Sequence, residues 1–325
     1  MTDDRIISLD LLTELNRLSD EPKDFRSIIP KYGSLTFYEN KYLAISMEAA
    51  SGAGKHGIIL IWDLNSNELF QKYNSKMVFG SLTYPSNENI IIANRNNDFC
   101  IYDTLSKEIT KTFYDDNVYA EEISASPDGK YFVAPDKWHH AVHLFDTETL
   151  TPKSNLYPRT LISWETCSTA YDANLIAVGG NQESGILCII NSVKWKTIKK
   201  WNTNKPQISH LIHIDITKDG TKLASSHMDK TIRIWDTKKG KILNTITEKD
   251  YPSNIAISPD GKYLVSGLGF KEITIRDTKT MNIVETLGGN VDNLYKCTLK
   301  FSSDGRYLAY PNNENSVSIF DMKTL

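Results

Sequence analysis

The sequence has few of the features that mark secreted, membrane-bound or zinc-binding proteins. Its four cysteines are far apart in 325 residues and form no CxxC pair: Cys100, Cys167, Cys188 and Cys297. Such spacing argues against a disulfide framework or a zinc site and favours reduced thiols in the cytoplasm. No apolar run is long enough to cross a membrane, and the N-terminal stretch MTDDRIISLDLL lacks the basic start of a signal peptide. The sequence predicts a cytoplasmic protein without a membrane anchor.

A strong charge of either sign is also missing. The 37 Lys and Arg residues nearly balance the 40 Asp and Glu residues, giving a net charge of -3. This balance gives no global attraction to nucleic acid or to an anionic membrane, so neither is expected as a partner. At 325 residues the chain exceeds the usual size of a single core, which predicts two domains or a repeat array.

The stretch Asp219–Ile246 shows the pattern that dominates the chain. It contains three short runs rich in β-branched residues, with Asp-Gly and other turn residues between them. Short strands joined by tight turns pair antiparallel, and so small a sheet needs copies of itself to bury its faces.

The copies are marked by an apolar residue followed by Asp or Asn at the end of the middle strand. This marker recurs seven times at intervals of 40 to 45 residues, at Trp62-Asp63, Tyr102-Asp103, Phe145-Asp146, Ile190-Asn191, Trp235-Asp236, Arg276-Asp277 and Phe320-Asp321. Four copies also carry an upstream Asp-Gly turn, with Gly129, Gly220, Gly261 and Gly305. In the other three, Asn40, Glu88 and Ala173 replace the glycine, which predicts a different turn type. The period matches a four-stranded propeller blade.

Through SPDGKYLVSG (258–267) and TIRIWD (231–236) the sequence resembles the WD-repeat β-propeller family. The resemblance covers residues 25–325 and implies an all-β, seven-bladed β-propeller of four-stranded blades around a channel. The family ties its blades with a hydrogen-bonded His, Ser or Thr, Asp and Trp. Ser225, Asp229 and Trp235 match three of these positions, whereas Gln207 stands at the His position. At the Asp position the other copies carry His56, Asn96, His139, Ser184, Phe270 and Glu314.

The seventh copy is one strand short. We expect the run Phe25–Ile29 to supply the missing outer strand and close the ring, because closure removes exposed sheet edges. Residues 1–24 form an N-terminal segment in this interpretation, and 25–325 form the propeller. Leucines at helical spacing predict a short helix over Ser8–Leu18, packed on the side of the propeller or docking a partner.

Several stretches invite a chemical interpretation. Glu48–Gly57 is an insertion that resembles a phosphate loop, but it lacks the first Gly and the Ser or Thr after Lys55, so we expect a flexible loop. His139, His140 and His143 suggest a metal, yet neighbouring strand residues point to opposite faces. We therefore predict no metal or other cofactor.

Two further stretches have competing explanations. His213 and Asp215 alternate with isoleucines on an inner strand, where they could serve a channel enzyme or form a satisfied core pair. Val193–Trp201 is basic with interleaved aromatics, but lysines also protect exposed sheet edges.

The resemblance implies a non-enzymatic interaction scaffold that binds a peptide or protein through the loops of one face. The expected contacts lie in the b–c and d–a loops: Lys55, His56, Arg95, Trp138, His139, Met228, Phe270, Tyr119, Arg159 and Tyr251. The alternatives are a lactonase-like propeller hydrolase with a channel metal, and a structural subunit of a multi-subunit complex bound by its sides.

Overall fold

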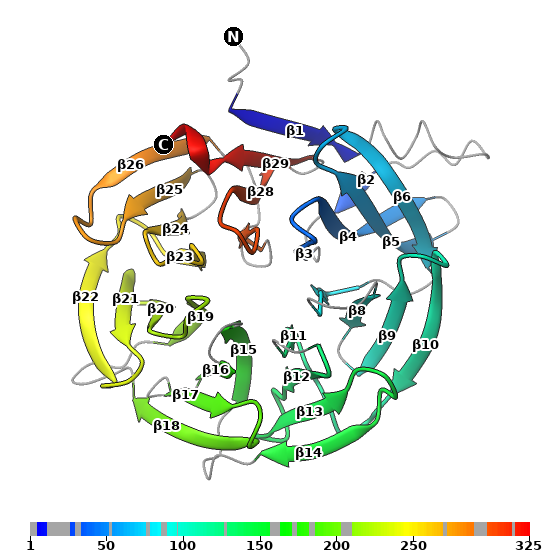
Figure 1. Ribbon diagram of the computed structural model, residues 1–325, viewed down its shortest axis with the longest axis horizontal. Helices are drawn as coiled ribbons and strands as arrows, with labels where there is room; N and C mark the ends of the chain where they lie inside the picture. The colour runs from blue at the N-terminus through cyan, green and yellow to red at the C-terminus, as the bar shows by residue number, and fades with distance from the viewer. Residues whose placement is uncertain are drawn as a thin grey trace.

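A closed ring of seven antiparallel sheets surrounds a central channel in the computed structural model (Figure 1). The structure describes residues 5–11, 27–29, 34–51, 54–75, 79–85, 90–95, 97–126, 129–156, 163–170, 174–181, 186–202, 210–268, 272–288, 298–313 and 316–325. Each sheet is one blade, with strand a beside the channel and strand d on the outer rim. The predicted seven-bladed, all-β architecture is confirmed.

The first four blades follow one another along the chain in the order a, b, c, d. They comprise β3 (Leu35–Tyr38), β4 (Tyr42–Ser51), β5 (Gly54–Asp63) and β6 (Glu68–Ser75); β7 (Ser81–Thr83), β8 (Ile90–Arg95), β9 (Asp98–Asp103) and β10 (Glu108–Tyr114); β11 (Ser124–Ala125), β12 (Tyr131–Pro135), β13 (Val142–Asp146) and β14 (Pro152–Leu156); and β15 (Ser163–Ala170), β16 (Leu175–Asn181), β17 (Ile186–Asn191) and β18 (Lys196–Asn202).

The last three blades repeat this order until the final strand d. They comprise β19 (Leu211–Ile216), β20 (Lys222–His227), β21 (Thr231–Asp236) and β22 (Lys241–Thr247); β23 (Pro252–Ile257), β24 (Tyr263–Leu268), β25 (Glu272–Asp277) and β26 (Ile283–Gly288); and β27 (Lys300–Phe301), β28 (Tyr307–Asn313) and β29 (Ser316–Asp321), followed by the 3-10 helix η3 (Met322–Thr324).

All seven strands c end at the Asp or Asn of the sequence marker, for a local chemical reason. In each blade one oxygen of this side chain accepts a hydrogen bond from a backbone N–H of the turn that follows, from Asn65, Leu105, Thr149, Lys194, Lys239, Lys279 and Lys323. Asn191 does this as well as aspartate does, because the amide also offers an oxygen. The marker is therefore a turn residue.

The a–b turn of blade one differs from the four Asp-Gly turns, as its sequence predicts. Gly129, Gly220, Gly261 and Gly305 all have a φ between 69° and 74°, in the left-handed region that favours glycine. In blade one, Glu39 and Asn40 both have a positive φ, 52° and 49°, so this turn has two left-handed residues in succession. Glu88 and Ala173 lie outside the described residues.

Ring closure uses a different N-terminal strand from the expected one. Strand β1 (Ile6–Asp10) pairs antiparallel with β29 and so becomes strand d of blade seven. The run expected to close the ring contributes β2 (Ser27–Ile29), which pairs instead with residues 48–50 of β4 in blade one. The expected helix is wrong at its start, because Ser8 to Asp10 belong to β1, and its residues 12–18 lie outside the described part.

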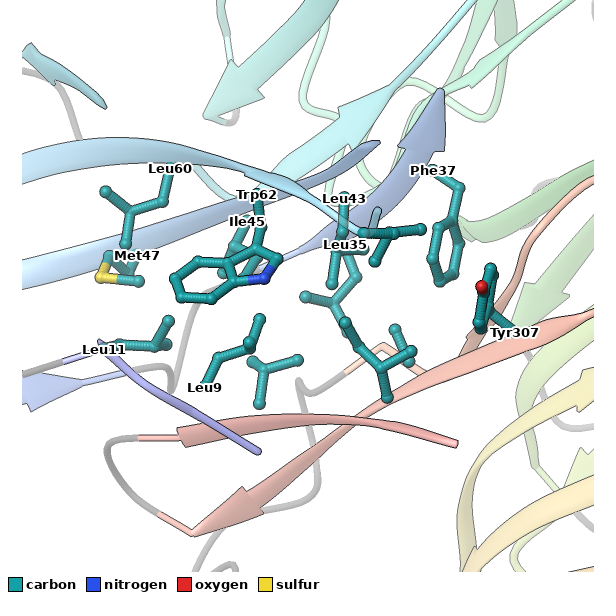
Figure 2. Packing of buried hydrophobic residues seen from close by; sticks show 14 of the residues in the cluster. Leu9, Leu11, Leu35, Phe37, Leu43, Ile45, Met47, Leu60, Trp62 and Tyr307 are labelled. Carbon is teal, nitrogen blue, oxygen red and sulfur yellow. The ribbon is translucent and has the colours of Figure 1, made fainter. Parts of the chain in front are cut away.

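The side chains of residues 6–11 explain why β1, and not β2, closes the ring. Leu9 and Leu11 are fully buried between blade seven and blade one, where they pack in one cluster with Trp62 and Met47 (Figure 2). Two leucines at a spacing of two residues present the same face to a neighbouring blade. The closing strand therefore adds hydrophobic contacts as well as main-chain hydrogen bonds.

The hydrophobic core is divided among the contacts between neighbouring blades. In the described residues there are seven buried clusters, and each joins one blade to the next around the ring. Strand β21 shows how: Ile232 and Ile234 pack towards blade six, while Trp235 packs towards blade four. Because successive side chains of a strand point to opposite faces, a middle strand holds two neighbours together.

Candidate interaction surface

The b–c turns and the d–a loops lie together at one end of the ring, which we call the loop face. Backbone hydrogen bonds join them: Lys137 N–H donates to Tyr119 O at 3.0 Å, Met228 N–H to His210 O at 2.9 Å, and Glu248 N–H to Lys230 O at 2.8 Å. Each bond links a b–c turn with a d–a loop. The loop face is thus braced by main-chain contacts at several places around the ring.

Among the residues that the structure describes, Trp138 is the most exposed aromatic side chain on the loop face. Its side chain, with 62% of its surface exposed, forms the tip of the turn between β12 and β13. The Tyr119 ring from the preceding d–a loop meets it edge-on, with ring centroids 5.9 Å apart. Beside them the Lys137 ammonium pairs with the Glu121 carboxylate at 3.0 Å. The structure thus brings together two of the predicted contact residues, Trp138 and Tyr119.

The carboxylate of Asp136 holds this turn in place. Its Oδ1 accepts hydrogen bonds from the backbone N–H groups of Trp138 and His139, at 2.7 and 2.9 Å. Its Oδ2 contacts His139 Nδ1 at 2.9 Å and His143 Nε2 at 3.0 Å. Burial alone would raise the pKa of Asp136, but these hydrogen bonds outweigh it and hold the pKa at about 2.

These contacts account for two of the three histidines that suggested a metal. His139 and His143 bind the same carboxylate, and the other ring nitrogen of His143 contacts Asn155 Oδ1 at 2.9 Å. Among the residues that the structure describes, no group of three or more His, Cys, Asp or Glu side chains is arranged to hold a metal ion.

A second exposed group lies on the loop face at blades five and six. Met228 in a b–c turn and Tyr251 in a d–a loop are 50% and 41% exposed. The Lys230 ammonium lies 5.1 Å from the centre of the Tyr251 ring, a cation–π contact between the turn and the loop. Met228 and Tyr251 are both on the predicted list of contacts.

The remaining predicted contacts have other surroundings. Lys55 and His56 belong to strand β5, because the insertion in blade one extends β4 and β5 into a long hairpin instead of forming a loop. Arg95 ends β8, where its backbone is in register with Asp98. Phe270 and Arg159 lie outside the described residues.

Blade five contains a buried chain of polar side chains. Trp235 Nε1–H donates to Ser225 Oγ at 2.7 Å, and Ser225 Oγ shares a hydrogen bond of 2.8 Å with His227 Nε2. His227 lies at the end of strand b, whereas the sequence comparison sought a histidine at position 207. Asp229 instead accepts bonds from Thr231 and from Arg233, whose Nη2 lies 2.6 Å from Oδ2.

This Trp–Ser–His arrangement coincides with the one segment that a family model matches. The WD domain, G-beta repeat model covers residues 195–236, which end at the Asp of the marker. The matched blade is one of seven in the ring. The chain is a seven-bladed β-propeller that contains a WD repeat.

Similarity to curated proteins extends over parts of the WD-repeat ring. The chain is 32% identical over 104 residues to the target of rapamycin complex subunit wat1 of Schizosaccharomyces pombe, which is 31% of this chain and 32% of that protein. It is 28% identical over 141 residues to the anaphase-promoting complex subunit cdc20 of Dictyostelium discoideum, 40% of this chain and 28% of the relative. Autophagy-related protein 16 of Arabidopsis thaliana is 23% identical over 144 residues, which is 41% of this chain and 28% of that protein. The matches span about a third of each relative, and two of these names denote subunits of complexes, which fits an interaction role.

Blade six carries a charged version of the WD-repeat set, which the sequence comparison missed. Glu248 occupies the d–a position equivalent to Gln207, and Arg276 occupies the position of Trp235. Arg276 donates from Nε to Glu248 Oε1 at 3.1 Å and from Nη2 to Oε2 at 2.8 Å. Ser266, equivalent to Ser225, also contacts Glu248 Oε1, at 3.3 Å. The only sequence signal was an arginine in a series of otherwise apolar marker residues.

The predicted His213–Asp215 pair on inner strand β19 does not form. His213 Nε2 instead lies 3.6 Å from Glu122 Oε1, while Asp215 accepts from Ser168 Oγ at 2.6 Å and from Ile257 N–H at 2.9 Å. Burial would raise the pKa of Glu122, but the contacts with His213 and Thr166 and the charge of Lys300 together outweigh it, and the pKa lies below its usual value. Asp215 therefore joins blades four, five and six at the channel.

Proposed function

We propose that this WD-repeat protein is a non-enzymatic scaffold that binds a peptide or protein partner through its loop face. The observation that carries the proposal is the exposed ring of Trp138 on a turn fixed by Asp136. A large aromatic side chain left in water gains free energy when a partner covers it, and aromatic residues dominate binding energy at protein interfaces.

The rigidity of the turn supports the same conclusion. Asp136 fixes the backbone N–H groups of residues 138 and 139, and Tyr119 supports one edge of the Trp138 ring. A preorganised contact loses less conformational entropy on binding than a mobile one does. Trp138 is therefore suited to be the anchor of an interface.

We extend the proposed surface to the other predicted contacts. Met228 and Tyr251 form its second exposed part, and His139 lies next to the anchor. Lys55, His56, Arg95, Phe270 and Arg159 remain candidates on the basis of the sequence. The two relatives named as subunits of complexes support membership in a multi-subunit complex.

The test compares two exposed apolar positions at opposite ends of the ring. Trp138→Ser should weaken capture of partners from a cell extract, read by quantitative mass spectrometry. Leu105→Ser is the matched control, because Leu105 is 72% exposed in a c–d turn away from the loop face. Both variants should melt at the wild-type temperature. Equal losses in the two variants, or no loss in either, would contradict the proposal.

We also propose a cytoplasmic location for the protein. Cys100, Cys167 and Cys188 are free and buried, as expected for thiols in a reducing compartment. In the described part of the chain, no helix is long and apolar enough to span a membrane.

A further inference from the structure

The outer rim of blades four and five has an unusual concentration of lysines. It consists of the c–d turns and outer strands β18 and β22, residues 192–202 and 237–247, which we call the basic flank. Seven lysines and no acidic residue lie in these two segments: Lys194, Lys196, Lys199, Lys200, Lys238, Lys239 and Lys241. All of them are exposed except Lys199, which is half-buried.

The corresponding segments of the other blades are balanced. Residues 64–75, 147–156 and 278–288 each contain one lysine and one glutamate, and residues 104–114 contain two lysines and one glutamate. Lysines that only protect sheet edges from pairing should occur on every outer strand, because all these edges face the same risk. The restriction to two neighbouring blades calls for a different explanation.

Exposed aliphatic side chains lie among these lysines. Val193 is 71% exposed, Ile198 53%, Ile242 45% and Leu243 48%. The aromatic residues of the segment are only half-exposed: Trp195 packs against the cluster between blades three and four, and Trp201 packs against Trp235 at 6.0 Å. A surface that mixes ammonium groups with exposed aliphatic carbons is not explained by solubility alone.

The two outer strands form one continuous surface. The Lys199 ammonium donates to the carbonyl oxygen of Lys238 at 3.0 Å, which joins β18 to the c–d turn of blade five. A Cβ added at Gly240 would lie 3.2 Å from Lys199 Cε, so this turn and the lysine stem are in close contact. In Figure 1, β18 and β22 follow one another along the outer rim.

We propose that the basic flank is a second binding surface, and that it takes an acidic protein segment carrying aliphatic side chains. On β18, Lys196, Ile198 and Lys200 are exposed in alternation with the half-buried residues between them. The pairing of β18 with β17 shifts register between Thr197 and Lys199, so Ile198 lies at a bulge and the exposed side chains do not form one regular row. A partner with interspersed acidic and aliphatic residues would match these ammonium groups and aliphatic side chains.

The exposed edges of the strands favour a peptide over a lipid surface. In the described part of the chain, β18 pairs only with β17 and β22 only with β21, so each leaves one edge without a neighbouring strand. Lipid cannot satisfy backbone N–H and C=O groups, whereas an extended peptide can. The inward packing of Trp195 and Trp201 also leaves no exposed aromatic ring on which nucleic-acid bases could stack.

The experiment uses the full chain and a fluorescent synthetic peptide in which Glu alternates with Leu, kept dilute so that it stays monomeric. Fluorescence anisotropy should show binding that weakens as salt is added. Reversing two exposed charges in Lys196→Glu with Lys238→Glu should raise Kd about tenfold. The matched control, Lys107→Glu with Lys279→Glu, changes the same charge on blades two and six and should stay within about twofold.

A second pair of variants tests the aliphatic component. Ile198→Ser with Leu243→Ser should also weaken binding, whereas Ile283→Ser with Val284→Ser, equally exposed on β26, should not. Trp138→Ser should leave binding unchanged, which separates this surface from the loop face. Equal affinity in the flank variants and controls, no binding of the peptide, or binding of phosphatidylserine vesicles or poly(dT) in its place would overturn the proposal.

Discussion

Arg276 binds both carboxylate oxygens of Glu248, with its Nε and Nη2 atoms 3.1 and 2.8 Å away. The arginine lies on strand c of blade six, and the glutamate lies in the loop that leads from blade five into that blade. Both side chains are nearly buried, at 13% and 2% exposure. Blade six thus has an ion pair where the neighbouring blade has Trp235 hydrogen-bonded to Ser225.

Glu248→Gln should lower the free energy of unfolding by about 3–5 kcal/mol. The substitution preserves volume but leaves the Arg276 charge buried without its counter-ion, and the cost of breaking a buried pair is of that size. Urea denaturation at neutral pH measures the change. The double variant Glu248→His with Arg276→Trp, which puts histidine and tryptophan at the positions where the WD-repeat family has them, removes the buried charge and should recover most of the loss.

Asp229→Asn provides the comparison for this prediction. Asp229 and Arg233 also form an ion pair, at 2.6 Å, but the carboxylate is 31% exposed. Its loss should cost less than about 1 kcal/mol, because water screens exposed pairs. If both single variants lose the same free energy, burial is not what makes the Glu248 pair important.

Ser225→Ala should destabilise blade five by about 1–3 kcal/mol. The change removes the acceptor for Trp235 Nε1–H and the hydrogen-bond partner of His227 Nε2, and a buried polar group without a partner costs this much. Chemical denaturation followed by tryptophan fluorescence measures it. Thr221→Ala in the exposed a–b turn of the same blade is the control, and an equal effect there would argue against a special role for the buried chain.

Stability should fall in acid in a way that depends on Asp136. Its pKa is about 2 in the folded protein, below its ordinary value of 3.8, so the carboxylate stabilises the fold above pH 4. This contribution, about 2 kcal/mol, is lost as the pH falls from about 4 to about 2. The difference in unfolding free energy between wild type and Asp136→Asn should shrink over that range. A difference that stays constant with pH would contradict the stabilising role of the Asp136 carboxylate.

Leu9→Ala should weaken ring closure. Leu9 is fully buried between blades seven and one, and removing such a side chain costs about 2–5 kcal/mol. Hydrogen exchange should accelerate in Ser316–Asp321, the strand paired with β1. Ser8→Ala, at an exposed position of the same strand, should leave exchange unchanged, and acceleration in both variants would point to a general loss of order.

Local rules made most of the fold predictable from the sequence. The marker Asp or Asn performs its function within a few residues, by accepting N–H bonds from the next turn, so it recurs visibly in every blade. The Asp-Gly turns are equally local, because a positive φ selects glycine at that position.

The closing strand depends on distant contacts and could not be predicted in the same way. Phe25–Ile29 and Ile6–Asp10 are both short and apolar, and the leucines from Leu11 to Leu18 also fit a helical period. What selects β1 is the fit of Leu9 and Leu11 against blade one, which no spacing within the segment reveals.

The interaction surface was predictable in part. The position of Trp138 at a turn tip predicted an exposed aromatic side chain, and the structure places Tyr119 beside it. The role of Asp136 was not visible, because it depends on His143 approaching from the next strand. Likewise, Glu248 was missed because a search for histidine at that position does not anticipate an acid matched by a distant arginine.

Because β1 pairs with β29, the ring can close only after almost the whole chain has been synthesised. Ile6 meets Phe320, so the strand that leaves the ribosome early has to wait for a partner more than 300 residues later. At about 5–20 residues per second that delay is roughly 15 to 60 s. For that time the first strand has only blade one to pack against, because its hydrogen-bonding partner β29 and the blade-seven side of the cluster have not been made. A chaperone that shields this open sheet edge would therefore be needed most in the interval before the last blade is made.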